Sequence, residues 1–250
     1  LSDTAYFLLS THDSLDGEIT DADFQAYVGD AVARGITAFR CTLAERRPQP
    51  PPAVADAEAG WLALLEPSHD LVRLDLLREA DRRLRWLLDR HPDAAIQLIL
   101  FPLERYRTDT RFWSKLSAAQ RERLQRYLVG RFAAYPQIMW LVLNDAHYST
   151  AATPGGPPEI PGGGSARQFP QNIAMARETG EFFQRHDPWR HPMSTGPART
   201  VPFHFEHEAW ATYIHLENNY DLGAAALAPY RAAAKPVFLG EDRYEQDHPD

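Results

Sequence analysis

Two acidic residues stand where short apolar segments end, a position from which side chains can do chemistry. Asn144-Asp145 follows the apolar run 138–143, and Gly240-Glu241 follows the run 237–239. Two carboxyl groups that face each other across a bound sugar can hydrolyse a glycosidic bond, because one protonates the leaving oxygen while the other attacks the sugar or activates water. A separation of about 5–5.5 Å predicts retention of configuration, and about 6.5–9.5 Å predicts inversion. The alternative is that each acid only terminates a strand at the surface.

Side chains close to these acids could contact a substrate. Asn144 could hydrogen-bond the sugar hydroxyl next to the reacting carbon, a bond that tightens in the transition state, or it could only cap the following loop. Tyr244 could donate a hydrogen bond to the carboxylate that attacks the sugar, or it could pack at the rim of the site. His147 could touch the substrate, although a loop histidine needs no function. Trp113 could offer its flat face to a sugar or pack beneath its own loop.

Alternating apolar and amphipathic segments predict the elements that hold these residues. Thr20 with Asp23, and Ser117 with Gln120, have the spacing of helix-initiating capping boxes. We expect helices over 20–34, 75–90, 117–132, 171–186 and 223–234, and strands over 6–9, 36–43, 95–101, 138–143, 192–195, 211–216 and 236–239. The apolar face of the first helix should comprise Phe24, Tyr27, Val28 and Ala31.

Seven strands separated by helices or long connections favour an α/β fold of the TIM-type (β/α)8 barrel over a doubly wound sheet. No Gly-rich phosphate loop follows a strand, which argues against nucleotide binding. Strands four and seven of such a barrel end opposite each other, so Asp145 and Glu241 can face each other. Only nine residues follow Glu241, so we expect one barrel domain over 1–250 that lacks its eighth β-α unit and is incomplete at both ends.

Several blocks of the sequence also resemble a known family. Asp3-Thr4-Ala5-Tyr6 is similar to Asp-Thr-Ala-Trp, and the segment 131–140 to Arg-Tyr-x-x-Tyr-Pro-Asn-Val-Ile-Trp. The segment 187–192 is similar to Asp-Pro-x-Arg-His-Pro, and 235–245 to Lys-Pro-Val-x-x-Gly-Glu-Pro-x-Tyr-Glu. These blocks, in this order, resemble the apiosidase-like glycoside hydrolases of family 140.

The resemblance implies a retaining glycosidase with Asp145 as acid/base and Glu241 as nucleophile, and it adds Asp3 to the substrate-binding residues. It also implies a secreted or periplasmic protein, although no signal peptide is visible in this chain. The family releases the branched sugar apiose from pectin side chains. The chain departs from the family pattern at Asn144, at Tyr6 and at Asp242, where the family has Gly, Trp and Pro, and these positions bear on the substrate.

Composition narrows the ligands. With 26 Lys and Arg against 34 Asp and Glu, the net charge of −8 argues against nucleic acid as the main ligand and suits a neutral or weakly charged one. No apolar run approaches the roughly 20 residues of a membrane span. The single cysteine, Cys41, lies in an apolar run and is expected to be a packed strand thiol. We predict no cofactor.

Two other functions stay open from the sequence. A degenerate barrel could bind carbohydrate without cleaving it. A metal-dependent hydrolase could use His204, Glu206, His207 and His215, although their spacing lacks the H-E-x-x-H pattern. Three long connections, 44–69, 103–116 and 146–170, should surround the site and set its specificity, so the sequence leaves open which sugar is bound.

Overall fold

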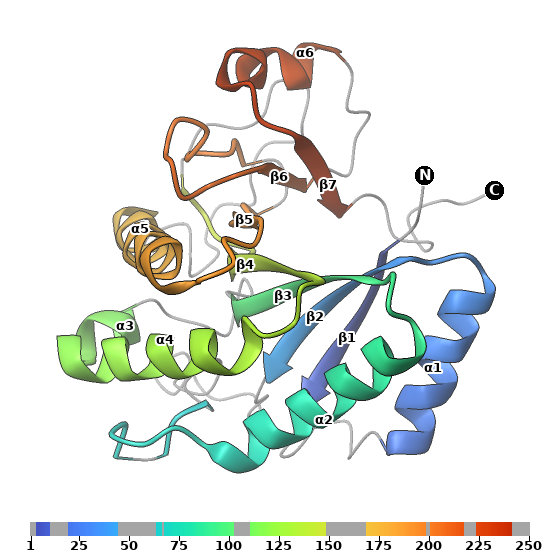
Figure 1. Cartoon of the computed structure of the whole chain (residues 1–250). Coiled ribbons are helices and arrows are strands. Elements are labelled where there is room, and N and C mark those ends of the chain that lie inside the picture. Colours follow the sequence, from blue (N-terminus) through green and yellow to red (C-terminus); the bar gives the residue numbers. More distant parts are fainter. Residues whose placement is uncertain are drawn as a thin grey trace, which may run out of the picture.

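The fold is built on two parallel β-sheets. A computed structural model of the chain describes residues 4–10, 20–44, 64–66, 68–102, 111–148, 169–198, 201–217 and 224–241. Within these residues, five strands form one sheet in the order β1-β2-β3-β4-β5, and β6 pairs with β7 in a second sheet. Every pairing between neighbouring strands is parallel. Figure 1 shows the larger sheet at the centre of the molecule, with β6 and β7 on its far side from α2.

The elements alternate along the chain. The strands are β1 (Thr4–Ser10), β2 (Ala38–Ala44), β3 (Ala95–Pro102), β4 (Ile138–Asn144), β5 (Met193–Ser194), β6 (Ile214–Glu217) and β7 (Val237–Glu241). The helices are α1 (Asp21–Ala33), α2 (Leu74–Arg90), α3 (Arg111–Lys115), α4 (Ala118–Phe132), α5 (Phe169–His186), α6 (Ala224–Leu227) and the 3-10 helix η4 (Ala228–Ala233).

Two helices begin where the capping patterns predict. The Thr20 side chain accepts from the backbone N–H of Asp23 and the Asp23 side chain accepts in return, which starts α1. Ser117 and Gln120 make the same reciprocal pair at the start of α4. On α1, Phe24, Val28 and Ala31 are buried as expected, but Tyr27 is 44% exposed, so the apolar face of this helix is narrower than predicted.

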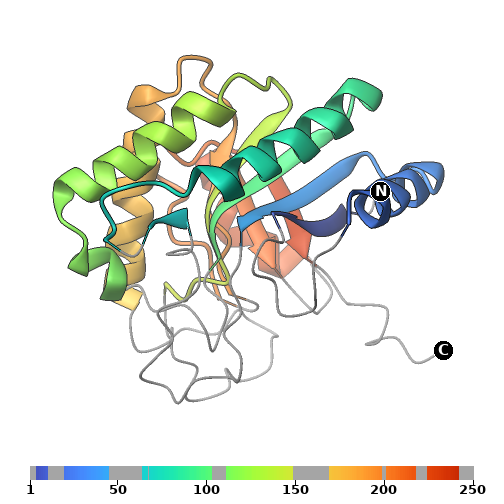
Figure 2. The ribbon, with the colours of Figure 1, turned by 90° about the horizontal axis from the view of Figure 1, so that it is seen from below.

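The larger sheet is covered on both faces. Along β4 every side chain except Met139 is buried, as the continuous apolar run predicts for a strand between two layers. On β2 the side chains of Phe39, Cys41 and Leu43 join the hydrophobic core, and between them Arg40 and Thr42 are also buried. Figures 1 and 2 show α1, α2 and α4 along one side of this sheet, and in Figure 2 the β6–β7 pair lies behind it.

Four local features differ from the prediction. The Ala-rich segment 223–234 is not one helix, because α6 gives way to the 3-10 helix η4 with Pro229 in its first turn and Ala234 in the left-handed conformation. Helix α3 lies inside the predicted connection 103–116. Strand β6 begins at Ile214, three residues later than expected, and β5 has only two residues.

The prediction of an α/β fold with parallel strands is confirmed. Closure of the two sheets into a (β/α)8 barrel stays a prediction, as does the single domain over 1–250. In the part of the chain that the structure describes, no helix has both the length and the hydropathy needed to cross a membrane.

Candidate active site

Asp145 is held at the carboxyl end of β4 in an unusual backbone conformation. Its φ of 55° lies in the left-handed region, which few residues other than glycine adopt. The residues on either side are fixed to the segment after β5: Gly196 N donates to Leu143 O at 2.7 Å, and Ala146 N donates to Gly196 O at 3.1 Å. The backbone around Asp145 is therefore hydrogen-bonded to Gly196 both before and after this residue, and the Asp145 side chain is partly exposed.

Beside Asp145 lies a group of buried polar side chains from four strands and both sheets, which we call the strand-end cluster. Its members are Arg40 (β2), Gln97 (β3), Asn144 (β4), and His215 and Glu217 (β6). Each of them is at most 5% exposed. Because buried polar groups are costly unless they are hydrogen-bonded, such a group among largely apolar strands needs a structural or functional reason.

Arg40 is the centre of the cluster. Its Nη2 donates to Glu217 Oε1 at 2.6 Å and also to Asn144 Oδ1, and its Nη1 donates to the backbone carbonyl of Gly240 at 3.3 Å. The side chains of the Arg40–Glu217 pair are 1% and 0% exposed. One guanidinium thus joins β4 of the larger sheet to both strands of the smaller sheet.

His215 extends the cluster away from Arg40. Gln97 Nε2 lies 3.1 Å from His215 Nδ1 and donates to Tyr213 Oη at 3.1 Å. An amide nitrogen can only donate, so His215 Nδ1 accepts and the ring proton resides on Nε2. That Nε2 lies 3.2 Å from Glu217 Oε1 and donates to it. Burial raises the pKa of the neighbouring Tyr213 above its ordinary value, so its hydroxyl stays protonated.

Two glycines let the backbone approach this cluster closely. A Cβ on Gly240 of β7 would lie 1.8 Å from Cε1 of the His215 ring. A Cβ on Gly196 would lie 2.9 Å from Glu217 Oε1 and 3.0 Å from Asn144 Oδ1. Gly240 therefore requires glycine for steric reasons, whereas a side chain at Gly196 would displace the Glu217 and Asn144 oxygens.

The predicted site residues are distributed unevenly in the structure. Asn144 belongs to the cluster, and its Nδ2 lies 3.4 Å from Asp145 Oδ2. The backbone of Glu241 lies in β7, where it pairs with Glu217 across a β-bulge. The structure does not describe the Glu241 side chain, and Asp3 and Tyr244 lie outside the described residues.

The remaining predicted contacts are buried. His147 is 5% exposed, and its carbonyl accepts from Asn172 Nδ2 at 2.9 Å. Trp113 is also 5% exposed. It packs against Phe101 at a ring-centroid distance of 5.4 Å and donates through Nε1 to Glu178 at 2.9 Å. This environment favours a packed ring over a sugar platform for Trp113.

Sequence reasoning did not single out Arg40, Gln97 or Glu217. The usable signal was that each interrupts an otherwise apolar strand with a strongly polar side chain, which must find a partner when buried. Cys41, which was expected to be a packed thiol, is buried, and burial raises its pKa well above its usual value. A buried neutral thiol is a poor nucleophile.

In the part of the chain that the structure describes, the residues of the metal hypothesis do not form a metal site. His204 and His207 are exposed, whereas His215 belongs to the strand-end cluster. Among the residues that the structure describes, no group of three or more His, Cys, Asp or Glu could hold a metal ion.

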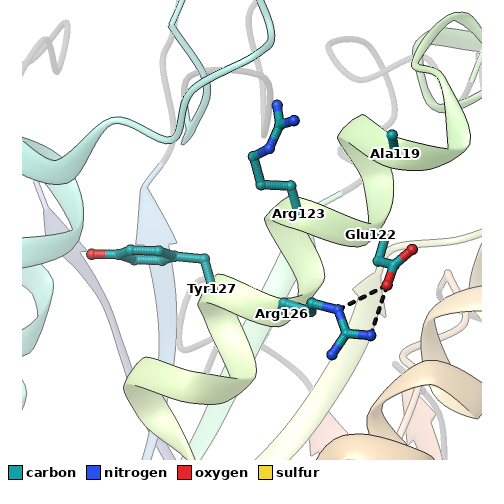
Figure 3. A pocket seen from close by; sticks show the side chains of 5 residues that line it. All are labelled: Ala119, Glu122, Arg123, Arg126 and Tyr127. Carbon is teal, nitrogen blue, oxygen red and sulfur yellow. Dashed lines mark hydrogen bonds and ion pairs between the residues drawn. The ribbon is translucent and has the colours of Figure 1, made fainter.

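A surface hollow lies away from the strand ends, on the outer side of α4 (Figure 3). It is lined by Ala119, Glu122, Arg123, Arg126 and Tyr127. Within it, Arg126 Nε donates to Glu122 Oε1 at 2.8 Å. None of these residues belongs to the strand-end cluster or is a predicted site residue.

Comparison with solved structures shows a glycoside hydrolase-like fold. The chain superposes with a TM-score of 0.64 on a Bacteroides vulgatus protein assigned to the glycoside hydrolases, at 14% identity over 94% of this chain and 42% of that protein. It superposes with a TM-score of 0.56 on a family 5 glycoside hydrolase from the same organism, at 11% identity over 91% of this chain and 46% of that protein. The chain thus spans less than half the length of either protein. No protein-family model matches the sequence, and no curated protein matches it.

Proposed function

We propose that this chain carries the active site of a retaining glycoside hydrolase in which Asp145 is the acid/base and Glu241 the nucleophile. The observation that carries the proposal is the strand-end cluster, which ties the end of β4 to β6 and β7 through Arg40. Asp145 directly follows Asn144 in the sequence, and Glu241 directly follows Gly240. The likeness of the fold to glycoside hydrolases supports the same reaction class.

The proposed reaction takes place in two steps. Asp145 gives its proton to the leaving oxygen while the Glu241 carboxylate attacks the anomeric carbon, which forms a glycosyl ester and releases the aglycone. Asp145, now ionised, takes a proton from water as that water attacks the anomeric carbon and frees Glu241. The overall configuration is retained because each step inverts it.

The same proposal includes barrel closure. A bond network that reaches from β2 and β4 to β6 and β7 is what a continuous parallel barrel would require, with the two sheets as its two described arcs. The net charge of −8 suits a neutral or weakly charged glycan as the substrate. The family resemblance makes apiose-containing pectin side chains the first substrates to test.

Hydrolysis by two variants tests the proposal. Aryl glycosides and pectin fragments are incubated with the wild type, Asp145→Ala and Glu241→Ala. Asp30→Asn, at an exposed position of α1, is a control that should keep wild-type activity. We expect both alanine variants to lose at least about 1,000-fold in kcat/KM. Added azide should restore Glu241→Ala with an inverted glycosyl azide and Asp145→Ala with a retained one. Full activity of both alanine variants would falsify the assignment, and glycan binding without cleavage by the wild type would select the carbohydrate-binding alternative.

A further inference from the structure

Glu217 is a carboxylate of the strand-end cluster to which the proposed reaction assigns no role. It lies at the end of β6, where its Cα is paired with that of Glu241 on β7. Its side chain is 0% exposed and bonds both to Arg40 and to His215. A carboxylate enclosed in this way cannot reach a substrate, so any part it has in the reaction must be exerted through a neighbour.

The neighbour that transmits its influence is Arg40. A guanidinium has only donors, so whichever Asn144 atom faces it must be the acceptor Oδ1. The amide Nδ2 is then directed to the other side, where it lies 3.4 Å from Asp145 Oδ2. Arg40 therefore prevents a flip of the Asn144 amide, so that the Asn144 Nδ2 donors point toward Asp145.

Glu217 in turn fixes Arg40. The 2.6 Å ion pair supplies the counter-charge that a buried guanidinium needs, and the bond from His215 Nε2 holds the same oxygen, Oε1. Gly196 lies against this contact: a Cβ there would come within 2.9 Å of Glu217 Oε1 and 3.0 Å of Asn144 Oδ1, the two oxygens that accept from Arg40 Nη2. Without the carboxylate, Arg40 would be free to turn toward another acceptor.

We propose that Glu217 is a positioning residue: through Arg40 it orients the Asn144 amide so that this amide donates to the sugar hydroxyl next to the reacting carbon. The inference rests on the proposed glycosidase function. A bond to that hydroxyl strengthens in the transition state, so a correctly oriented donor raises kcat more than it lowers KM.

The test compares Glu217→Gln on matched aryl glycosides with and without the 2-hydroxyl. We expect kcat/KM for the hydroxylated substrate to fall on the order of 100-fold, mostly in kcat, because a misplaced group costs about that much. The 2-deoxy substrate should lose no more than about threefold, because it cannot accept the Asn144 bond. In an Asn144→Ala background, Glu217→Gln should likewise add no more than about threefold. An equal loss on both substrates, or losses that multiply in the double variant, would overturn the proposal.

A second variant guards against misfolding of Glu217→Gln. Arg40→Lys keeps the positive charge, but an ammonium cannot hold Glu217, Asn144 and the Gly240 carbonyl in one planar fork. Arg40→Lys should therefore also lose far more activity on the hydroxylated substrate than on the 2-deoxy substrate. Glu208→Gln is the matched control, because it neutralises another ion-paired carboxylate, bound to Arg177, outside the strand-end cluster.

An NMR measurement separates failure of this inference from failure of the proposed function. The side-chain amide signal of Asn144 is identified by its loss in Asn144→Ala, and its shift and solvent exchange are then followed in each variant. We expect Glu217→Gln to shift it and speed its exchange, and Glu208→Gln to leave it unchanged. If the wild type hydrolyses no glycoside, the glycosidase function fails, while this signal still shows whether Glu217 orients the Asn144 amide. An unchanged signal in Glu217→Gln overturns that positioning role, whatever the activity.

Discussion

Asp187 illustrates how one buried carboxylate can fix a turn. It lies between α5 and β5 and accepts from Trp140 Nε1 at 2.9 Å, His191 Nδ1 at 2.8 Å and His191 N at 2.9 Å. Burial alone would raise the pKa of Asp187, but the donors from Trp140 and His191 outweigh it and hold the pKa below its ordinary value. Because the folded-state pKa is lowered, the ionised form contributes stability above the unfolded-state pKa of about 3.9, and this contribution is lost as the pH falls through the folded value.

We therefore predict that Asp187→Asn lowers the free energy of unfolding by about 1–3 kcal/mol at pH 7. The Asn carbonyl can replace only one of the two carboxylate oxygens, so its Nδ2 would face the backbone N–H of Trp189 that Oδ1 now accepts, and the remaining bonds would lose the negative charge of their acceptor. The difference from the wild type should shrink below about pH 4. Urea unfolding at pH 7 and thermal unfolding down to pH 3 measure it. Asp30→Asn, in an exposed ion pair with Arg34, should change little at either pH. A difference that stays constant with pH would contradict the role of the ionised carboxylate.

At this scale the sequence could predict Asn144 and Asp145, because an apolar run that ends in polar residues marks a strand end. It could not predict the contact between Arg40 and Glu217, which are 177 positions apart. Their pairing depends on how two sheets are arranged, and neither residue has a local pattern that names its partner. The left-handed backbone conformation of Asp145 is likewise set by the backbone hydrogen bonds of its neighbours to Gly196, which no spacing along the chain encodes.

At the scale of the elements, helix α5 packs closely against Trp210 because Gly180 has no side chain. A Cβ on Gly180 would lie 2.3 Å from Cδ2 of the buried Trp210 ring. We predict that Gly180→Ala destabilises the protein by about 1–3 kcal/mol, because the indole has no free space into which to move. Gly29→Ala and Gly130→Ala are matched helical controls with nothing within 4 Å, and each should be stabilising by up to about 1 kcal/mol. Denaturant midpoints compare the three, and a neutral Gly180→Ala would show that α5 can shift away from Trp210.

Elements with strong local signals were the ones that the sequence predicted well. The capping boxes at Thr20 and Ser117 place α1 and α4 because they satisfy the first backbone N–H groups within a few residues. The Ala-rich segment was mispredicted because propensity favours a helix there, whereas Pro229 lacks the N–H that a continued α-helix would need. The start of β6 was placed too early because its pairing with β7, rather than its apolar run, sets where the strand begins.

For the molecule as a whole, the Arg40–Glu217 pair is a buried connection between the two sheets. Removing one partner of such a pair leaves an uncompensated charge, so Arg40→Met should cost about 3–5 kcal/mol in the free energy of unfolding. Replacing both, as Arg40→Met with Glu217→Leu, should restore most of that loss, because apolar side chains of similar volume remove the desolvation penalty of both ions. Recovery should be incomplete, since His215 and Asn144 each lose one partner.

The double variant separates stability from function. If the ion pair exists to orient Asn144, the restored protein should be stable in urea yet remain impaired on 2-hydroxy glycosides, because nothing then holds the amide in place. Equilibrium unfolding and hydrolysis measured on the same preparations decide this. A double variant that is less stable than Arg40→Met alone would mean that the pair holds the two sheets together by its own attraction. A double variant that regains full hydrolysis would mean that the connection between the two sheets functions without the charges of the Arg40–Glu217 ion pair.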